Sequence, residues 1–269
     1  MISYFSAFIL SLIEGLTEFV PVSSTGHMII ASSLMGLRDE AIKTFEIFIQ
    51  LGAILSVVAL YPRRFLALIP RSGALGTQGN LSGTAGIMRF ALACAPVFVL
   101  GFLFHKIIKT YLFGPTTVAA ALIFGGVLMI VIEKRNIQPR ILNLNNIPLK
   151  TCLLIGLAQC LALWPGMSRS GATIIGGMLL GLERRVAAEF SFLVAVPVMC
   201  VAVGYDLLKS IDTIVIADMP IFLFGFVLAF IVSLFAVKYF VTLLGRVTLR
   251  GFGWYRIIVG VLVLGYFWR

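Results

Sequence analysis

Hydrophobic residues run along this chain in long, nearly unbroken stretches, and most polar residues are gathered in the short segments between them. A helix needs about 20 mostly apolar residues to cross a bilayer. Six stretches approach that length and are predicted to span a membrane: 43–60, 86–104, 115–132, 186–208, 219–241 and 252–268. The pattern therefore predicts an all-α integral membrane protein with about six transmembrane helices.

Two further apolar stretches end differently from the six. Residues 4–20 and 149–163 run into Pro21 and Pro165 and then directly into turns rich in Ser and Gly. Irregular backbone at membrane depth is tolerated only where it is buried in protein or lines a polar cavity. These stretches are therefore predicted to form two re-entrant helical hairpins.

The composition supports this class and limits the partners. Of the residues, 60% are hydrophobic and only 12% are charged. A soluble domain could not bury that much apolar surface, so the composition is typical of a membrane protein. Its net charge of +10 comes from basic residues scattered over loops and not gathered on one face, so no nucleic-acid partner is expected. The expected partner is the phospholipid bilayer.

The basic loops predict an orientation, because cytoplasmic loops carry an excess of Lys and Arg. Three loops hold most of these residues: Arg63, Arg64 and Arg71 after the first span, Lys134, Arg135, Arg140 and Lys150 after the third, and Arg246 and Arg250 after the fifth. We expect these loops in the cytoplasm. The loop at 209–218, with Asp212 and Asp218, the segment 106–114 and both termini would face outward.

The two halves of the chain repeat at a fixed offset. Gly26 and Gly171 are 145 residues apart, and the same offset aligns Ser23-Ser-Thr-Gly with Ser168-Arg-Ser-Gly. Chance similarity between Gly/Ser turns is the alternative explanation. The register continues into the next predicted helix, where Phe45 matches Phe190, and this favours a true repeat.

Each half contains one re-entrant segment, one Ser/Gly turn and three spans. Since three is odd, the second half must be inverted relative to the first, a plan that places sites at the repeat interface near the bilayer midplane. We therefore predict a single membrane domain over 1–269, made of two inverted repeats at about 1–135 and 146–269 and joined by a short cytoplasmic loop.

Glu14 and Glu18 are four residues apart, hence on one face of a helix. Two like charges so placed repel each other, so either one is protonated or both share a wet cavity with a cation. The plainer alternative is a carboxylate pair exposed at the membrane interface. A divalent cation, Mg²⁺ or Ca²⁺, is the better interpretation if the substrate is anionic, and Glu14 and Glu18 are its predicted ligands.

The turn after Pro21 holds Ser23, Ser24, Thr25 and His27. A hydroxyl near an imidazole, with a carboxylate to orient it, is the minimum for an activated nucleophile. The same Ser and Thr residues are also ordinary in turns and helix caps, and His27 could be a packed histidine that donates to a carbonyl.

The second turn, Ser168-Arg169-Ser170-Gly-Ala-Thr173, precedes an apolar helix. Successive backbone N–H groups, hydroxyls and a helix N-terminus form an anion-binding nest, and Arg169 adds a fork that matches phosphate oxygens. The alternative is a simple N-cap with an arginine that reaches the interface.

Polar residues outside the two turns are also informative. Glu46 and Gln50, four apart in the first span, are either supporting groups of the site or a hydrogen-bonded pair between helices. Arg184, Arg185 and Glu189, at the start of the fourth span, are interpreted as a charge cluster at the membrane edge.

At these motifs the chain resembles a known family. Glu14-x-x-x-Glu18, Pro21-Val-Ser-Ser-Thr-Gly-His27 and Pro165-Gly-Met-Ser-Arg-Ser-Gly-Ala-Thr173 are similar to the bacitracin-resistance type of undecaprenyl-pyrophosphate phosphatase of bacteria, and the resemblance covers essentially the whole chain. It implies hydrolysis of an isoprenoid pyrophosphate lipid to undecaprenyl phosphate and inorganic phosphate, which recycles the carrier lipid of cell-wall synthesis. It also implies metal dependence, a location in the bacterial cytoplasmic (inner) membrane with the active site facing its outer side, and bacitracin resistance.

Within this interpretation the residues receive predicted roles. Ser24 attacks the terminal phosphorus, with His27 as its base or as the acid for the leaving group; the rivals are His27 as nucleophile and His27 activating water. Glu18 and Arg169 complete the catalytic set. The substrate-binding set is Ser23, Thr25, Ser168, Ser170 and Thr173.

A different class of protein could use the same groups. Inverted repeats with broken helices are typical of transporters, so a lipid-phosphate transporter or flippase with the same anion site is the alternative function. A carrier needs the anion cradle but not a nucleophile beside a base. The sequence leaves open a homo-oligomer, the metal used in the cell and the strictness of lipid-tail selection.

Overall fold

The computed structural model describes residues 2–37, 39–69, 79–135, 137–210, 216–245 and 247–267, and these contain helices and turns but no β-strand. The helices of the first half are α1 (Tyr4–Thr17), α2 (Ser24–Leu34), α3 (Glu40–Leu60), α4 (Pro62–Leu66), α5 (Gly83–Tyr111) and α6 (Pro115–Lys134). The second half has α7 (Leu149–Gln159), the 3-10 turn η2 (Cys160–Leu163), α8 (Arg169–Leu179), α9 (Arg184–Lys209), α10 (Met219–Leu244) and α11 (Arg250–Phe267). The predicted all-α membrane protein is confirmed.

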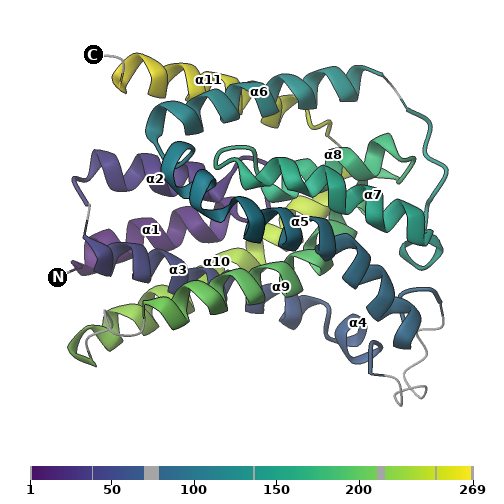
Figure 1. Cartoon of the computed structure of the whole chain (residues 1–269), viewed down its shortest axis with the longest axis horizontal. Coiled ribbons are helices and arrows are strands. Elements are labelled where there is room, and N and C mark those ends of the chain that lie inside the picture. Colours follow the sequence, from purple (N-terminus) through teal and green to yellow (C-terminus); the bar gives the residue numbers. More distant parts are fainter. Residues whose placement is uncertain are drawn as a thin grey trace.

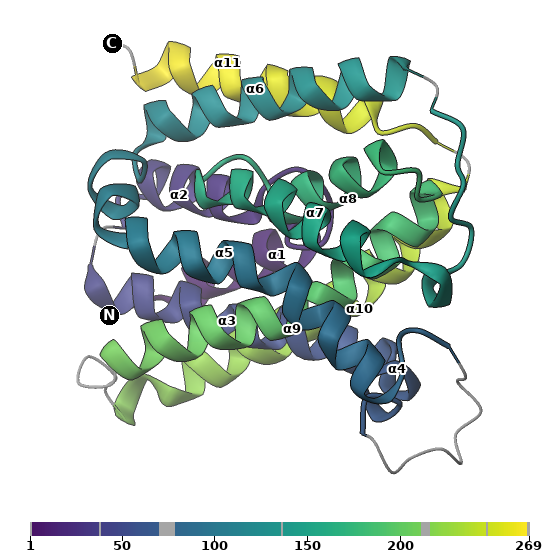
Figure 2. The same ribbon diagram turned by 45° about the vertical axis from the view of Figure 1, so that its right-hand side comes forward.

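Five of the six predicted spans are helices long and apolar enough to cross a membrane: α3, α5, α6, α9 and α10. The sixth forms α11, an 18-residue helix that contains Arg250 and Arg256 and falls outside that group. It packs along α6 and runs in the opposite direction (Figures 1 and 2). The chain is therefore a multi-pass membrane protein.

Both short apolar stretches form hairpins whose tips lie inside the bundle. α1 runs inward from the end that carries the N-terminus, and α2 returns toward the same end (Figure 1). α7 and η2 enter from the opposite end, and α8 returns there. The prediction of two re-entrant hairpins agrees with this arrangement.

Matching helices of the two halves run in opposite directions. α3 opposes α9 and α5 opposes α10, and both chain ends lie at one end of the bundle (Figure 1). The packing also crosses between halves, since α1 contacts α10 of the second half and α7 contacts α5 of the first. The hairpins are thus held by the other half's long helices. The division at about 1–135 and 146–269 stays a prediction.

Close helix contacts depend on small residues. A Cβ atom at Gly156 of α7 would lie 2.6 Å from the carbonyl oxygen of Ala93 on α5, so only glycine permits this approach. Gly52 of α3 lies closer still to α10, since a Cβ atom there would be 2.3 Å from the Phe226 carbonyl oxygen. These contacts hold α7 closely against α5 and α3 closely against α10.

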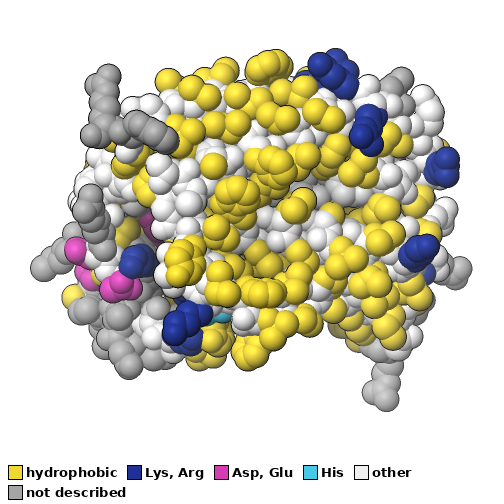
Figure 3. Space-filling model, turned by 45° about the horizontal axis from the view of Figure 1, so that its top comes forward, with side chains coloured by type: hydrophobic (Ala, Val, Ile, Leu, Met, Phe, Trp, Pro, Cys, Tyr) yellow, Lys and Arg dark blue, Asp and Glu magenta, His cyan; other side chains and the backbone are white. Residues whose placement is uncertain are grey.

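The two ends of the helical bundle carry different charged side chains. Hydrophobic side chains cover the face between the two ends. The charged side chains visible at the right-hand end are Lys and Arg, whereas the left-hand end carries acidic side chains together with Lys or Arg (Figure 3). The right-hand end carries the loops after α3 and α6. Arg71, Asp212 and Arg246 lie outside the described residues. Which end faces the cytoplasm stays a prediction.

Candidate active site

The two Ser/Gly turns share one backbone geometry. Ser23 and Ser168 adopt left-handed φ values of 75° and 69°, an uncommon conformation for residues with a side chain. Each caps the helix that follows: Ser23 Oγ accepts from the Gly26 N–H at 3.2 Å, and Ser168 Oγ from the Gly171 N–H at 3.0 Å. The N-termini of α2 and α8 are therefore capped in the same way, by a serine in the left-handed conformation.

A buried arginine ties the two turns together. Arg256 of α11 is fully buried and donates to the carbonyls of Gly166 and Met167, both at 2.9 Å. A longer bond of 3.4 Å reaches the Pro21 carbonyl in the first turn. The sequence analysis missed Arg256, although a charged residue inside an apolar span is a strong functional signal.

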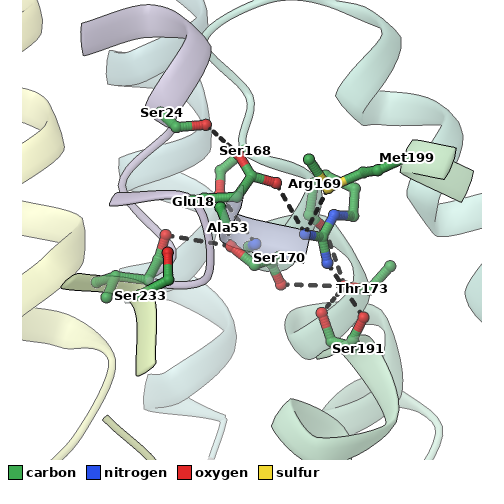
Figure 4. Close-up of polar contacts among 12 residues, drawn as sticks. Glu18, Ser24, Ala53, Ser168, Arg169, Ser170, Thr173, Ser191, Met199 and Ser233 are labelled. Atoms are coloured by element: carbon green, nitrogen blue, oxygen red, sulfur yellow. Dashed lines mark hydrogen bonds and ion pairs between the residues drawn. The ribbon is translucent and has the colours of Figure 1, made fainter. Parts of the chain in front are cut away.

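Glu18 stands at the centre of the site, between the first residues of the two capped helices (Figure 4). Its Oε2 accepts a short hydrogen bond from Ser24 Oγ, and its Oε1 accepts from Arg169 Nη2 at 2.9 Å. The side chains of Glu18 and Arg169 are only 8% and 13% exposed, so this pair is largely screened from solvent. Three residues of the predicted catalytic set are thus in direct contact.

Arg169 is held from two further sides. Its Nη1 donates to the Ser191 carbonyl at 3.1 Å, and its guanidinium lies 5.5 Å from the centre of the Phe19 ring. Such a fixed planar fork suits bidentate recognition of phosphate oxygens. The arrangement can neutralise an anion that enters beside Ser24.

A cavity of about 160 Å³ opens at this contact. It is lined by residues from both turns and from neighbouring helices: Glu18, Ser23, Ser24, Thr25, Gln50, Ala162, Pro165, Gly166, Ser168, Arg169 and Met199. Of the predicted substrate-binding residues, Ser23, Thr25 and Ser168 therefore face it. Gln50 faces it as well, whereas its partner in the sequence analysis, Glu46, bonds Ser32 instead.

Ser170 and Thr173 lie outside the lining of the cavity. Ser170 Oγ donates to the Val20 carbonyl at 3.1 Å, and Thr173 Oγ1 is 2.6 Å from Ser191 Oγ. These contacts fasten α8 to the first turn and to α9. The structure thus indicates that Ser170 and Thr173 support the residues that line the cavity. Direct contact of these two residues with the substrate stays a prediction.

His27 has partners other than Ser24 in the described structure. Its Nδ1 lies 2.8 Å from the Ser23 carbonyl, and its Nε2 lies 2.8 Å from the Tyr255 hydroxyl. Its ring stacks on Tyr255 with an interplanar angle of 2°. The structure thus pairs Ser24 with a carboxylate and His27 with Ser23 and Tyr255, and the roles predicted for Ser24 and His27 stay predictions. Tyr255 was missed because it lies in a span interpreted only as a helix.

Glu14 lies one helical turn before Glu18 and is fully buried. Neither of its carboxylate oxygens has a hydrogen-bond partner among the described residues. A buried carboxylate without a donor fits a cation or a proton. Within the same part of the chain no group of three or more His, Cys, Asp or Glu residues gathers around a possible metal position.

The chain matches known proteins over nearly its whole length. The model of the family described as bacitracin resistance protein BacA matches residues 7–262. A protein of Maridesulfovibrio salexigens named undecaprenyl-diphosphatase is 49% identical over 269 residues, which covers 100% of both chains. Proteins of the same name from Desulfovibrio desulfuricans and Nitratidesulfovibrio vulgaris are 49% and 50% identical, over 96% of each chain. The chain therefore belongs to the bacitracin resistance protein BacA family.

Proposed function

We propose that this chain hydrolyses undecaprenyl pyrophosphate to undecaprenyl phosphate and inorganic phosphate. The observation that carries the proposal is Glu18, whose carboxylate bonds both the Ser24 hydroxyl and the Arg169 guanidinium at the cavity. This contact joins a nucleophile, a proton acceptor and an anion-binding group. The names of the relatives agree with the same reaction.

The substrate carries several negative charges that the site must neutralise before attack on phosphorus. Arg169 supplies a full positive charge, and the N-termini of α2 and α8 supply backbone N–H groups beside it. Positioning and charge stabilisation account for most of the catalysis of phosphoryl transfer. Both are present where the two turns meet.

Ser24 is the proposed nucleophile and Glu18 its base. Ser24 Oγ forms a bond to the terminal phosphorus while the bond from that phosphorus to the bridging oxygen breaks, and undecaprenyl phosphate leaves. The Ser24 proton passes to Glu18 Oε2, its hydrogen-bond partner. Water then attacks the phosphoserine, which restores the Ser24 hydroxyl and releases inorganic phosphate. Arg169 exchanges its bond with Glu18 for the substrate phosphate, which frees Glu18 to accept the proton.

Glu14 and Glu18 are the proposed holders of a divalent cation. The fit rests on the two unpartnered oxygens of buried Glu14, and the remaining ligands would come from water and substrate. When bound, Mg²⁺ or Ca²⁺ would offset the charge of the pyrophosphate.

The proposed location is the bacterial cytoplasmic membrane, with the active site open to its outer side. The support is the excess of Lys and Arg in the loops after α3 and α6, which favours a cytoplasmic position for that end. The isoprenoid tail would lie among the apolar side chains of the lipid-facing surface. A homo-oligomer stays a prediction.

The test is phosphate release from undecaprenyl pyrophosphate by the purified, detergent-solubilised protein, with and without a chelator. Release that needs both metal and Arg169, the latter shown with Arg169→Ala, supports the proposal. Arg250→Ala, at the start of α11 and away from the cavity, is the matched control. No release by folded protein would overturn the proposal and favour lipid transport through the same anion site.

A further inference from the structure

A second cavity, of about 400 Å³, lies far along the bundle from the active site, near the ends of α6 and α10 and the start of α9. Its apolar lining, called here the apolar wall, includes Ile132, Ile137 and Leu244. Its charged lining, called here the charged wall, consists of Glu133, Glu183, Arg184 and Arg185. Arg185 is also paired through Nε with Glu189 at 3.0 Å. This end carries the basic loops, where the helices end and lipid headgroups would lie (Figure 1).

A buried ion pair forms the inner part of the charged wall. Glu133, only 8% exposed, bonds through Oε1 to Arg184 Nη2. Arg184 Nη1 also donates to the Val247 carbonyl at 3.1 Å and to the Leu244 carbonyl at 3.4 Å. These contacts account for one carboxylate oxygen and two guanidinium nitrogens.

Two atoms of this pair remain without a partner among the described residues. They are Glu133 Oε2, an acceptor, and Arg184 Nε, a donor, and both are buried. A buried charged group that lacks one of its hydrogen bonds is costly. Both residues line the cavity, so a ligand there with a donor at one end and an acceptor at the other, a zwitterion, matches this pair.

We propose that this cavity binds the headgroup of a phospholipid with a primary ammonium group, of the phosphatidylethanolamine type. The ammonium donates to the Glu133 carboxylate, and the phosphate accepts from Arg184 and from Arg185 at the cavity edge. The acyl chains leave over the apolar wall. A trimethylated ammonium has no N–H to donate, and a glycerol headgroup has no positive charge, so this site distinguishes among common bilayer lipids.

The test is native mass spectrometry of the full-length protein in detergent, titrated separately with phosphatidylethanolamine, phosphatidylcholine and phosphatidylglycerol of matched acyl chains. We expect phosphatidylethanolamine to be retained at about tenfold lower concentration than the other two, since one charge-assisted hydrogen bond distinguishes them. Glu133→Gln should abolish this preference. Equal retention of the three lipids would overturn the proposal, with water as the partner of the two atoms.

A second variant separates binding from folding. Ile137→Trp narrows the cavity from its apolar wall and leaves the ion pair intact, so it should reduce phosphatidylethanolamine retention in a protein that elutes as a folded species. Arg250→Gln, outside the cavity lining, should retain the lipid normally. Unchanged lipid preference in both Glu133→Gln and Ile137→Trp would refute the site.

Discussion

The two re-entrant turns have the same backbone and different chemistry. Ser23 and Ser168 cap their helices identically, yet the next residue is Ser24 in the first turn and Arg169 in the second. Both of these first helical residues bond the same carboxylate, Glu18. Two turns with one backbone geometry thus place different side chains at matching positions, and the proposed function depends on that difference.

The asymmetry has a physical use. A hydroxyl at a helix N-terminus is a nucleophile beside backbone N–H groups, whereas a guanidinium at the matching position is a fixed positive charge. One symmetric turn pair with two hydroxyls would lack charge neutralisation, and one with two arginines would lack a nucleophile. Variants at positions 24 and 169 therefore test whether the first turn supplies the nucleophile and the second turn supplies the positive charge.

The largest expected effect is that of Ser24→Ala. If Ser24 is the nucleophile, phosphate release should fall by at least about 10³-fold, because losing the attacking group leaves only binding and charge stabilisation. Acid-quenched wild-type protein should carry phosphate on Ser24 by peptide mapping. Ser33→Ala, later in the same helix, should keep wild-type activity. Phosphate mapped to His27 would contradict the assignment of Ser24 as the nucleophile.

The next effect is at the matching position of the second turn. Arg169→Lys keeps the charge but cannot bridge Glu18, the Ser191 carbonyl and a phosphate with one planar fork. We expect a fall of about 10²-fold in kcat/KM, which is the scale of losing one oriented charge-stabilising group. Arg250→Lys is the matched control. Wild-type activity in Arg169→Lys would show that charge alone suffices.

Arg256 holds both turns, so its loss should disturb them together. Arg256→Met leaves the Gly166 and Met167 carbonyls without their donor, at about 1–3 kcal/mol for each buried group. We expect a lower thermal unfolding midpoint in detergent and about tenfold less phosphate release. Arg250→Met, at the exposed start of the same helix, should change neither. Reduced activity with an unchanged unfolding midpoint would instead assign Arg256 to the chemistry alone.

The sequence predicted the elements better than the contacts. Long apolar runs ending at Pro21 and Pro165 were sufficient to predict the hairpins, and the 145-residue offset predicted that Ser23 and Ser168 correspond. The bond from Ser24 to Glu18 could not be inferred, because a left-handed residue at position 23 sets where the hydroxyl points.

The residues that were missed come from the far end of the chain. Tyr255 and Arg256 reach the site from α11, which follows the second turn by more than 75 positions (250 − 173 = 77). The spacing of residues along a sequence predicts which residues are neighbours within one helix or turn. It does not predict which distant helix packs against that helix or turn. Arg256 nevertheless carried a readable signal, since a charged residue in an apolar span usually has a buried partner.

The smallest expected effect concerns the pairing of His27 with Tyr255, which has no counterpart in the second turn because Ala172 stands at the position matching His27. Tyr255→Phe keeps the stacked ring and removes only the hydroxyl bonded to Nε2. If His27 orients the Ser23 carbonyl, a loss of one neutral hydrogen bond should lower kcat about threefold to tenfold with little change in KM. Tyr239→Phe, on the exposed side of α10, is the control. A much larger loss, together with a shifted pH profile of kcat, would mean that the imidazole of His27 itself transfers a proton. Catalysis would then depend on His27 as well as on the Ser24 hydroxyl and the Arg169 guanidinium.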